Sequence, residues 1–315
     1  MKKILVTIFA LVLATVCTAQ VTDFPSREVK VITSLPAGSG PDVLLRTITN
    51  QLSAKWKFAV VTENKPGGAG AIGLLAYNKE MPEGYAIYYS DSSVMISYPT
   101  LYNNQEIIKN IKPLTPVTRN YMMMIGSPKI KDFKELETVT RNNPIFGSWG
   151  VGSAGHMLGL EVSDFLNIKP THVPYREYGQ WYTDTSSGSL SFGFSTIASS
   201  IAMEQAGKIK YFAYAGPTRH PDFPNVPTLR ELTKHQFGYT TAWIAFFINK
   251  NVPQEITTKL SQDLVDVMSN DAVKLQLEKL KYNPWQVSTT EFEQVISNET
   301  KVYKQISTKH NIKEN

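Results

Sequence analysis

Cysteine and long apolar segments are scarce in this sequence of 315 residues. Its single cysteine, Cys17, lies in an N-terminal leader that we expect to be removed. The mature chain then forms no disulfide and offers no thiol nucleophile or cysteine ligand for a metal. After the leader, the longest apolar candidate, WIAFFI, has the length of a strand and not of a membrane span. A disulfide scaffold, a cysteine enzyme and a membrane-spanning protein are therefore excluded.

Histidine and net charge are also low. The five histidines show no HExxH spacing and no adjoining cluster of carboxylates, so we expect no metal site and no cofactor. Lysine and arginine exceed aspartate and glutamate by 32 to 27, and removing the two lysines of the leader lowers the formal charge from +5 to +3. So small and dispersed a charge argues against a nucleic-acid partner.

The leader has the pattern of a secretory signal peptide. Two lysines precede the apolar run ILVTIFALVLATV, and small residues follow it up to Ala19. We therefore expect residues 1–19 to be a signal peptide cleaved near Ala19, and the mature protein to be soluble in the periplasm. A lipoprotein acylated at Cys17 is the weaker alternative, because Val16 stands where a small residue is expected.

Strand-like and helix-like runs alternate along the rest of the chain, which is typical of an α/β protein with mostly parallel sheets. An apolar run flanked by prolines at 114–127 and an aromatic strand at 238–249 are the expected crossings between two domains. These crossings predict a discontinuous domain I at 20–120 and 240–315, and a domain II at 121–239. A stretch rich in serine and threonine follows from 176 to 189, and we assign no element to it.

Two loops of small residues each lead into a helix. Residues 31–48, VITSLPAGSGPDVLLRTI, combine a buried strand, a Pro/Gly loop and a helix that starts near Pro41 and Asp42. Residues 147–159, GSWGVGSAGHMLG, repeat this arrangement. A loop of this kind presents unpaired backbone N–H groups at a helix N-terminus, so each predicts an anion site.

Several long segments resemble the Bug receptors, the periplasmic solute receptors of tripartite tricarboxylate transporters. They are FPSREVKVITSLPAGSGPD, VTENKPGGAGAIG, PEGYAIYYSDSS, FGSWGVGSAGH, HPDFPNVPTLREL and AWIAFFINKNVP. The resemblance implies a two-domain type II periplasmic-binding-protein fold with mixed, mostly parallel sheets and a ligand cleft between the domains. It also implies a monomeric receptor that grips a small organic carboxylate through backbone N–H groups and water, and delivers it to an integral-membrane permease.

The expected ligand contacts come from the two loops and from the polar ends of two strands. They are Ala37, Gly38, Ser39, Gly40, Ser92, Ser93, Gly150, Val151, Gly152, Ser153, His156 and Ser195. For His156 two roles stay open, because it can donate to the anion or anchor its loop. Asp42 is expected to serve the helix start, since its carboxylate would repel an anion.

The chain departs from the family pattern between residues 176 and 195. Arg176–Tyr178 replace a lysine-glycine pair, and Trp181 and Tyr182 replace smaller residues, either to face an aromatic acid or to pack. Ser195 stands where relatives often carry an aspartate. Since an amino-acid ligand would need a carboxylate for its ammonium group, this loss favours a ligand that is not an amino acid.

Enzymatic alternatives find little support in the motifs. Gly150–Gly155 satisfies G-x-G-x-x-G, with Glu177 roughly 20 residues further on, as in dinucleotide sites. So short a match arises easily by chance. G-x-S-x-G and Walker A patterns are absent. We therefore expect a binding protein and no catalytic residue, either a transport receptor or a sensor that docks on a membrane partner.

Overall fold

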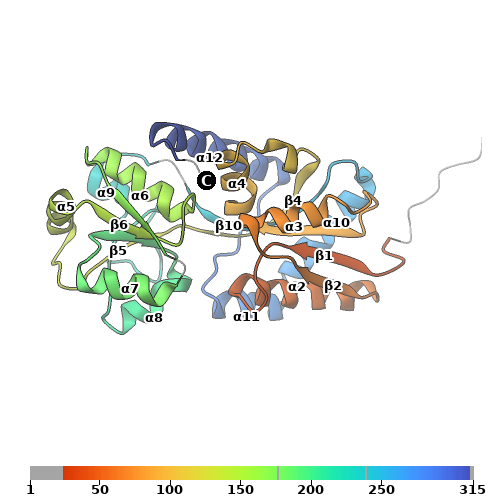
Figure 1. Ribbon diagram of the computed structural model, residues 1–315. Helices are drawn as coiled ribbons and strands as arrows, with labels where there is room; N and C mark the ends of the chain where they lie inside the picture. The colour runs from red at the N-terminus through yellow and green to blue at the C-terminus, as the bar shows by residue number, and fades with distance from the viewer. Residues whose placement is uncertain (1–23, 176, 238–239, 313–315) are drawn as a thin grey trace, which may run out of the picture.

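The computed structural model describes residues 24–312, except residue 176 and residues 238–239. The expected signal peptide and its cleavage site near Ala19 lie outside the described residues. Two five-stranded sheets, each covered by helices, form two domains side by side (Figure 1). The predicted two-domain α/β architecture is therefore confirmed.

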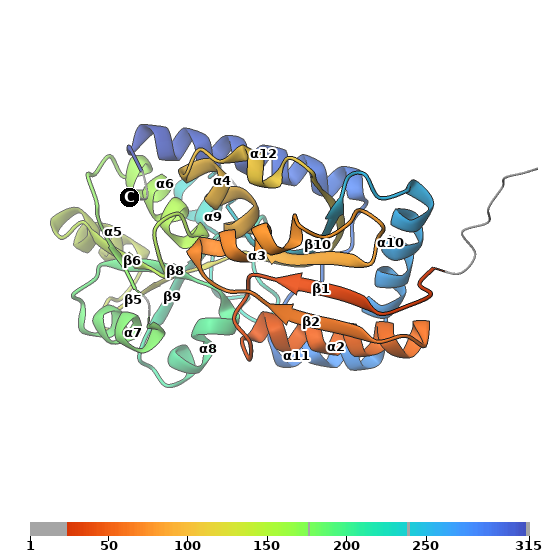
Figure 2. The same cartoon turned by 45° about the vertical axis from the view of Figure 1, so that its right-hand side comes forward.

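The first domain is built on a sheet in the order β2-β1-β3-β10-β4. β1 pairs in parallel with β2 and β3, whereas β10 is antiparallel to both of its neighbours. The strands are β1 (Val29–Thr33), β2 (Val60–Asn64), β3 (Ala86–Asp91), β4 (Ile111–Asn120) and β10 (Ala242–Asn249). The helices of this part are α2 (Gly40–Trp56), α3 (Ala71–Tyr77), α4 (Tyr98–Leu101), α10 (Gln254–Met268) and α11 (Asp271–Lys279). Helices α2, α10 and α11 pack against one another on one face of the sheet (Figure 2).

The second domain is built on a sheet in the order β7-β6-β8-β5-β9. Its strands are β5 (Met123–Gly126), β6 (Ile145–Ser148), β7 (Thr171–Pro174), β8 (Phe192–Ser195) and β9 (Lys210–Tyr214). Its helices are α5 (Phe133–Asn142), α6 (Ala154–Phe165), α7 (Tyr178–Ser187), α8 (Ile197–Gln205) and α9 (Leu229–Thr233). In both sheets the strands that lead into cleft loops run parallel to a neighbour, so those loops emerge at the same edge.

Helix α7 lies in the Ser/Thr-rich stretch that ends at residue 189, for which neither helix nor strand was predicted from the sequence. Trp181, Tyr182 and Thr185 bury one side of this helix, a spacing that brings side chains to a common face. Gly188 ends the helix with φ +91°, a left-handed conformation that favours glycine. The helix was not predicted because serine and threonine have low helix propensity. They do not prevent the face that carries Trp181 and Tyr182 from being buried.

The chain passes from the first sheet to the second between β4 and β5, and returns before β10. A third link is the C-terminal helix α12 (Thr289–Lys309), which extends along both domains (Figure 2). At its end Lys309 and His310 contact the carboxylate of Asp164 on α6, at 2.8 and 3.1 Å. The exact domain bounds stay a prediction, but α12 clearly spans both parts.

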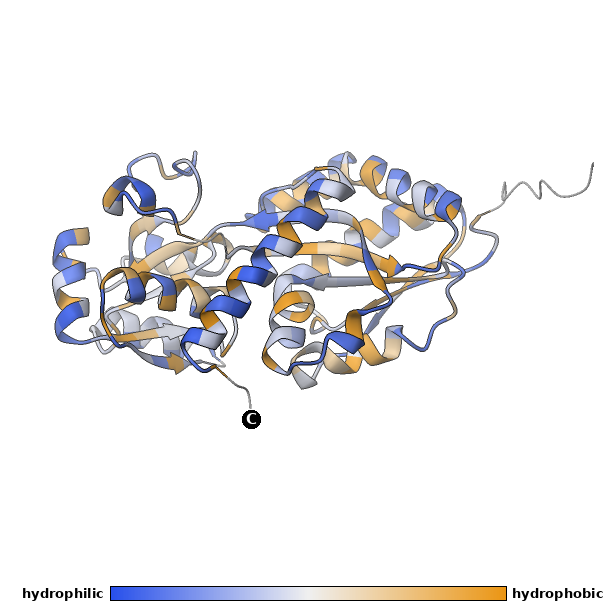
Figure 3. Ribbon diagram, turned by 90° about the horizontal axis from the view of Figure 1, so that it is seen from above, coloured by the Kyte–Doolittle hydropathy of each residue, from blue (hydrophilic) through white to orange (hydrophobic). Residues whose placement is uncertain are grey.

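Hydrophobic residues gather on the sheets and on the inner faces of the helices (Figure 3). One buried cluster extends from Tyr88 in the first domain to Phe146 in the second, and Phe292 of α12 belongs to it. Burial of such side chains stabilises the fold by about 1.5–3 kcal/mol each. Within the described part of the chain, no helix has the length and apolar character needed to cross a membrane.

Candidate ligand-binding cleft

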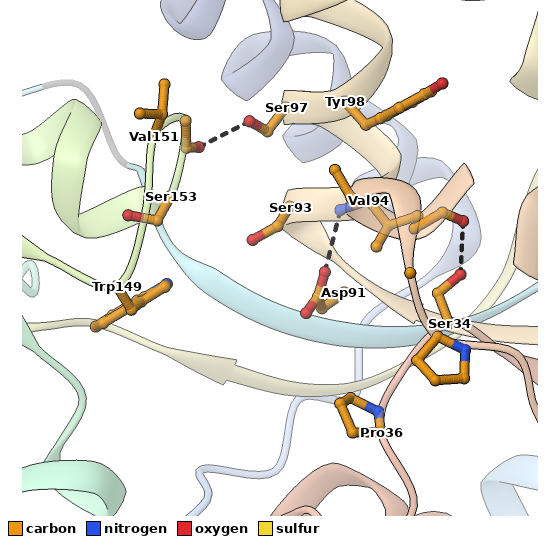
Figure 4. A pocket seen from close by; sticks show the side chains of 15 residues that line it. Ser34, Pro36, Asp91, Ser93, Val94, Ser97, Tyr98, Trp149, Val151 and Ser153 are labelled. Carbon is orange, nitrogen blue, oxygen red and sulfur yellow. Dashed lines mark hydrogen bonds between the residues drawn. The ribbon is translucent and has the colours of Figure 1, made fainter. Parts of the chain in front are cut away.

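Two neighbouring cavities lie between the domains, with volumes of about 310 and 550 Å³. They share the lining residues Asp91, Ser93 and Trp149, so we treat them as the smaller and the larger part of one cleft. Figure 4 shows the smaller part, with Asp91 and Ser93 on one side and Trp149 and Ser153 on the other. These volumes suit a small organic molecule.

The first loop is held by its own polar groups. Ser39 caps α2 by accepting a hydrogen bond from the Asp42 N–H, and its hydroxyl donates to the Pro36 carbonyl at 2.7 Å. The Gly38 N–H donates to the buried carboxylate of Asp42 at 2.8 Å. Burial raises the pKa of Asp42, but hydrogen bonds from Asn64, Gly38 and Arg46 outweigh it and the pKa is lowered. Asp42 therefore shapes the loop.

The second loop is held in the same way by α6. Ser153 caps this helix, accepting from the His156 N–H at 3.2 Å and donating to the Ser148 hydroxyl at 3.1 Å. The Gly152 N–H donates to His156 Nδ1 at 3.0 Å. Burial, with the neighbouring charge of His172, lowers the pKa of His156 to about 3, so its ring is neutral and Nδ1 accepts. Two roles were left open for His156, and its hydrogen bond with the Gly152 N–H supports the one in which it anchors the loop.

Helices α2 and α6 point their N-termini into the larger part of the cleft from opposite domains. Gly40 and Ala154, the first residues of these helices, both line it. The first N–H groups of a helix have no intrahelical partner, and the helix dipole is positive there. Lys279 and Lys281, at the end of α11, line the same part. Two helix N-termini and two lysines around one cavity favour an anion.

The expected contact residues divide into those that line the cleft and those that do not. Val151, Gly152 and Ser153 line the smaller part of the cleft, Ser39, Gly40 and Ser92 line the larger part, and Ser93 lines both. Ala37, Gly38, Gly150, His156 and Ser195 line neither part.

Ser195 is not brought into the cleft because a neighbouring aromatic residue covers it. Its side chain is fully buried, and its hydroxyl lies 3.0 Å from that of Tyr182. Trp181 and Tyr182 are themselves buried and stack on each other. The alternative that they pack, and do not face a ligand, is therefore the one observed. Arg176 lies outside the described residues.

Several cleft residues were missed from the sequence. Trp149 stands inside the second loop and could have been found there, since it directly precedes the glycines. Tyr178 is the residue of the divergent stretch that does line the cleft, at the start of α7. Tyr282 comes from the distant segment after α11, and no local pattern marks it. In the sequence, Asp91 is one of four polar residues at the end of a predicted strand, Ser90–Ser93, and nothing there distinguishes it from the other three.

The two domains touch at the rim of the cleft. The Ser97 hydroxyl of the first domain donates to the Gly152 carbonyl of the second at 2.8 Å (Figure 4). Glu177, the acidic residue that a dinucleotide site would need, lines neither part of the cleft. In the described ranges, no group of three or more histidine, cysteine, aspartate or glutamate residues could hold a metal ion.

Comparison with known proteins agrees with this geometry. Residues 44–312 match the family described as tripartite tricarboxylate transporter family receptor. A UPF0065 protein of Bordetella pertussis is 25% identical over 289 residues, which cover 89% of this chain and 88% of that protein.

Solved structures share the fold. The periplasmic binding protein BugD has a TM-score of 0.74 at 20% identity, covering 93% of this chain and 100% of BugD. R. palustris Rpa4515, determined with adipate, has a TM-score of 0.76 at 20% identity, covering 92% of this chain and 99% of its own. The fold class expected from the sequence is therefore confirmed.

Proposed function

Because the chain belongs to the tripartite tricarboxylate transporter receptor family, as its resemblance to the Bug receptors indicated, we propose that it captures a small organic carboxylate between its domains and delivers it to a membrane permease. The observation that carries this proposal is the pair of opposed helix N-termini, at Gly40 and Ala154, on one cavity with two lysines. A protein of the same fold is known with adipate, which is a dicarboxylate.

The mechanism is binding and domain closure without bond chemistry. A carboxylate can contact the N-termini of α2 and α6 together only when the domains are close, so it stabilises the closed arrangement. The hydrogen bond from Ser97 to the Gly152 carbonyl adds to this arrangement. In this proposal residues 1–19 direct export to the periplasm, the mature chain acts as a monomer, and the permease recognises the closed complex.

Removing the cleft lysines tests the site. We expect the double variant Lys279→Gln with Lys281→Asn to weaken binding of dicarboxylates such as adipate and succinate about tenfold, because two favourable charges are lost. Asn is chosen at 281 because the backbone there has φ +54°. Isothermal titration calorimetry gives the affinities.

Lys274→Gln is the matched control, because Lys274 is an exposed residue of the same helix that lines neither part of the cleft. This control should bind as the wild type does. Equal affinity for the wild type and the double variant would contradict the proposed anion site. Copurification of a membrane permease that depends on the added acid tests the delivery step.

A further inference from the structure

Resting on the proposed function, and naming its substrate class more closely, we propose that Asp91 binds a cationic group of the ligand. The receptor then selects acids that also carry an ammonium group over plain carboxylic acids. The serine at position 195 favoured the opposite expectation, since no acid faces a ligand there. The structure instead provides a carboxylate at another strand end, in the middle of the cleft.

Asp91 occupies a central place in the cleft. It is the last residue of β3, at the carboxyl end of a strand inside the first sheet, paired with Ile244 of β10. It lines both the smaller and the larger part of the cleft, together with Ser93 and Trp149. In Figure 4 its carboxylate lies beside Ser93, with Trp149 across the cavity. A ligand that extends through both parts of the cleft passes this carboxylate.

In the part of the chain that the structure describes, the surroundings of Asp91 contain hydrogen-bond donors but no counter-ion. The Val94 N–H donates to Oδ1 at 3.1 Å. Burial raises the pKa of Asp91, and the backbone amides of Val94, Ser93 and Asp91 itself oppose that rise. Among the described residues, no lysine or arginine is paired with this carboxylate or acts on its pKa. A half-buried carboxylate without a counter-ion is stabilised by a cation that approaches from the cleft.

Aromatic side chains surround the same position. Tyr178 and Tyr282 line the larger part; burial raises the pKa of both hydroxyl groups, and the negative charge of Asp91 adds a smaller contribution. Trp149 lines both parts and is supported by an edge contact with Trp181, with ring centroids 5.8 Å apart. Aromatic faces attract ammonium groups, most strongly tryptophan. Asp91 and these rings together favour a cation and disfavour a carboxylate.

The groups around the larger part of the cleft therefore have opposite preferences. Gly40, Ala154 and the lysines of α11 favour the carboxylate of the ligand, whereas Asp91, which lines the same cavity, repels a carboxylate. A molecule with a carboxylate and an ammonium group satisfies both kinds of group at once. A plain acid leaves the charge of Asp91 uncompensated.

Asp91 also has a simpler role, which the test must separate from ligand binding. Its hydrogen bond to the Val94 N–H caps the helical segment Ser93–Ser97. Asparagine caps equally well but carries no charge, so Asp91→Asn keeps this bond and removes the proposed interaction. Asp91→Ser is a second variant that can cap. Asp132→Asn is the matched control, since Asp132 caps α5 by accepting from Glu135 on the exposed surface.

The experiment is calorimetric titration of the mature wild type and the three variants with matched ligand pairs. The pairs are succinate with aspartate, glutarate with glutamate, and 3-phenylpropanoate with phenylalanine, which differ only in the ammonium group. We expect the wild type to bind the amino acid of at least one pair tenfold or more tightly than the plain acid. Asp91→Asn and Asp91→Ser should lose that preference by tenfold or more, and Asp132→Asn should keep it.

Two results would count against these ideas in different ways. If plain acids bind as tightly as their amino-acid partners, or if the Asp91 variants keep the preference, the role of Asp91 is wrong while the carboxylate receptor stands. If no member of any pair binds, the proposed function itself is contradicted.

Discussion

Gly152 lies at a direct contact between the two domains. Its carbonyl accepts the hydrogen bond from Ser97, and its N–H donates to His156. Its φ of +76° is left-handed, and a Cβ at this position would collide with the Ser97 hydroxyl and with Leu101. A side chain here would therefore displace the Ser97 hydroxyl and Leu101, and with them the hydrogen bond between the domains.

We expect Gly152→Ala to weaken carboxylate binding about tenfold or more, because part of the binding energy must then overcome a clash between the domains. Gly150→Ala is the control. It also has a positive φ, +139°, but a Cβ there meets no atom within 4 Å. Affinities of the two variants for the same acid, measured by calorimetry, should differ. If they are equal, the Gly152 contact has no part in closure.

At the scale of single residues, local signals were the predictable ones. Asp42 lies in the first turn of α2 and shapes the loop before it, as its place at the helix start indicated, whereas the capping roles of Ser39 and Ser153 were not predicted. The burial of Ser195 could not be predicted, because it depends on a contact with Tyr182, thirteen residues away, that no local sequence pattern indicates. The lining role of Tyr282 likewise arises only when α11 packs on α2.

Among the elements, α12 connects the domains and carries a buried carboxylate. Glu299 is almost fully buried, and accepts hydrogen bonds from Trp243 Nε1 at 2.8 Å and from the Thr241 hydroxyl. Arg119 lies 3.5 Å away. Burial raises the pKa of Glu299 to about 7, although these bonds and the Arg119 charge oppose it. Thr241 and Arg119 belong to the two crossings between the domains, so this carboxylate of α12 contacts both of them.

Glu299 should make stability fall as pH rises. Its ordinary pKa of 4.5 rises to about 7 on folding, so between these values the folded state holds the proton more tightly. The raised pKa of Glu299 therefore stabilises the folded state fully below pH 4.5, by up to about 3 kcal/mol. This stabilisation is lost as the pH rises to about 7. Glu299→Gln cannot lose a proton there.

We therefore expect the free energy of unfolding of Glu299→Gln, relative to the wild type, to increase between pH 5 and pH 8. Urea unfolding at several pH values measures it. The difference between the two proteins is needed, because burial lowers the pKa of His156 and of His172, which gives the opposite trend below pH 6.5. A difference that does not change with pH would show that Glu299 does not titrate in this range.

Element types were predictable where apolar periodicity was strong, as in the strands of both sheets. Helix α7 was missed, because its serines and threonines resemble a loop while Trp181 and Tyr182 supply the buried face. The path of α12 across both domains could not be predicted either. Its sequence pattern gives an amphipathic helix, but only the fold shows that its end pairs with Asp164 of α6.

For the whole molecule, the alternation of strands and helices and the family resemblance together predicted the fold. The identity of the ligand could not be predicted from the sequence. The cleft combines residues from β3, α2, α6, α7 and α11, which are up to about 240 positions apart in the chain. What the assembled cleft adds is a pair of opposed helix N-termini, two lysines and a central carboxylate.

The most direct test of the receptor is the thermal unfolding of the purified mature protein with a panel of acids. The panel contains succinate, adipate, citrate, 3-phenylpropanoate, aspartate and glutamate, with glucose as an uncharged control. At a hundredfold excess over Kd, binding stabilises the folded state by about 2.7 kcal/mol, or about 5 °C in Tm for a chain of this size. We predict such a rise with at least one acid and none with glucose. A Tm that no acid changes would contradict a carboxylate receptor.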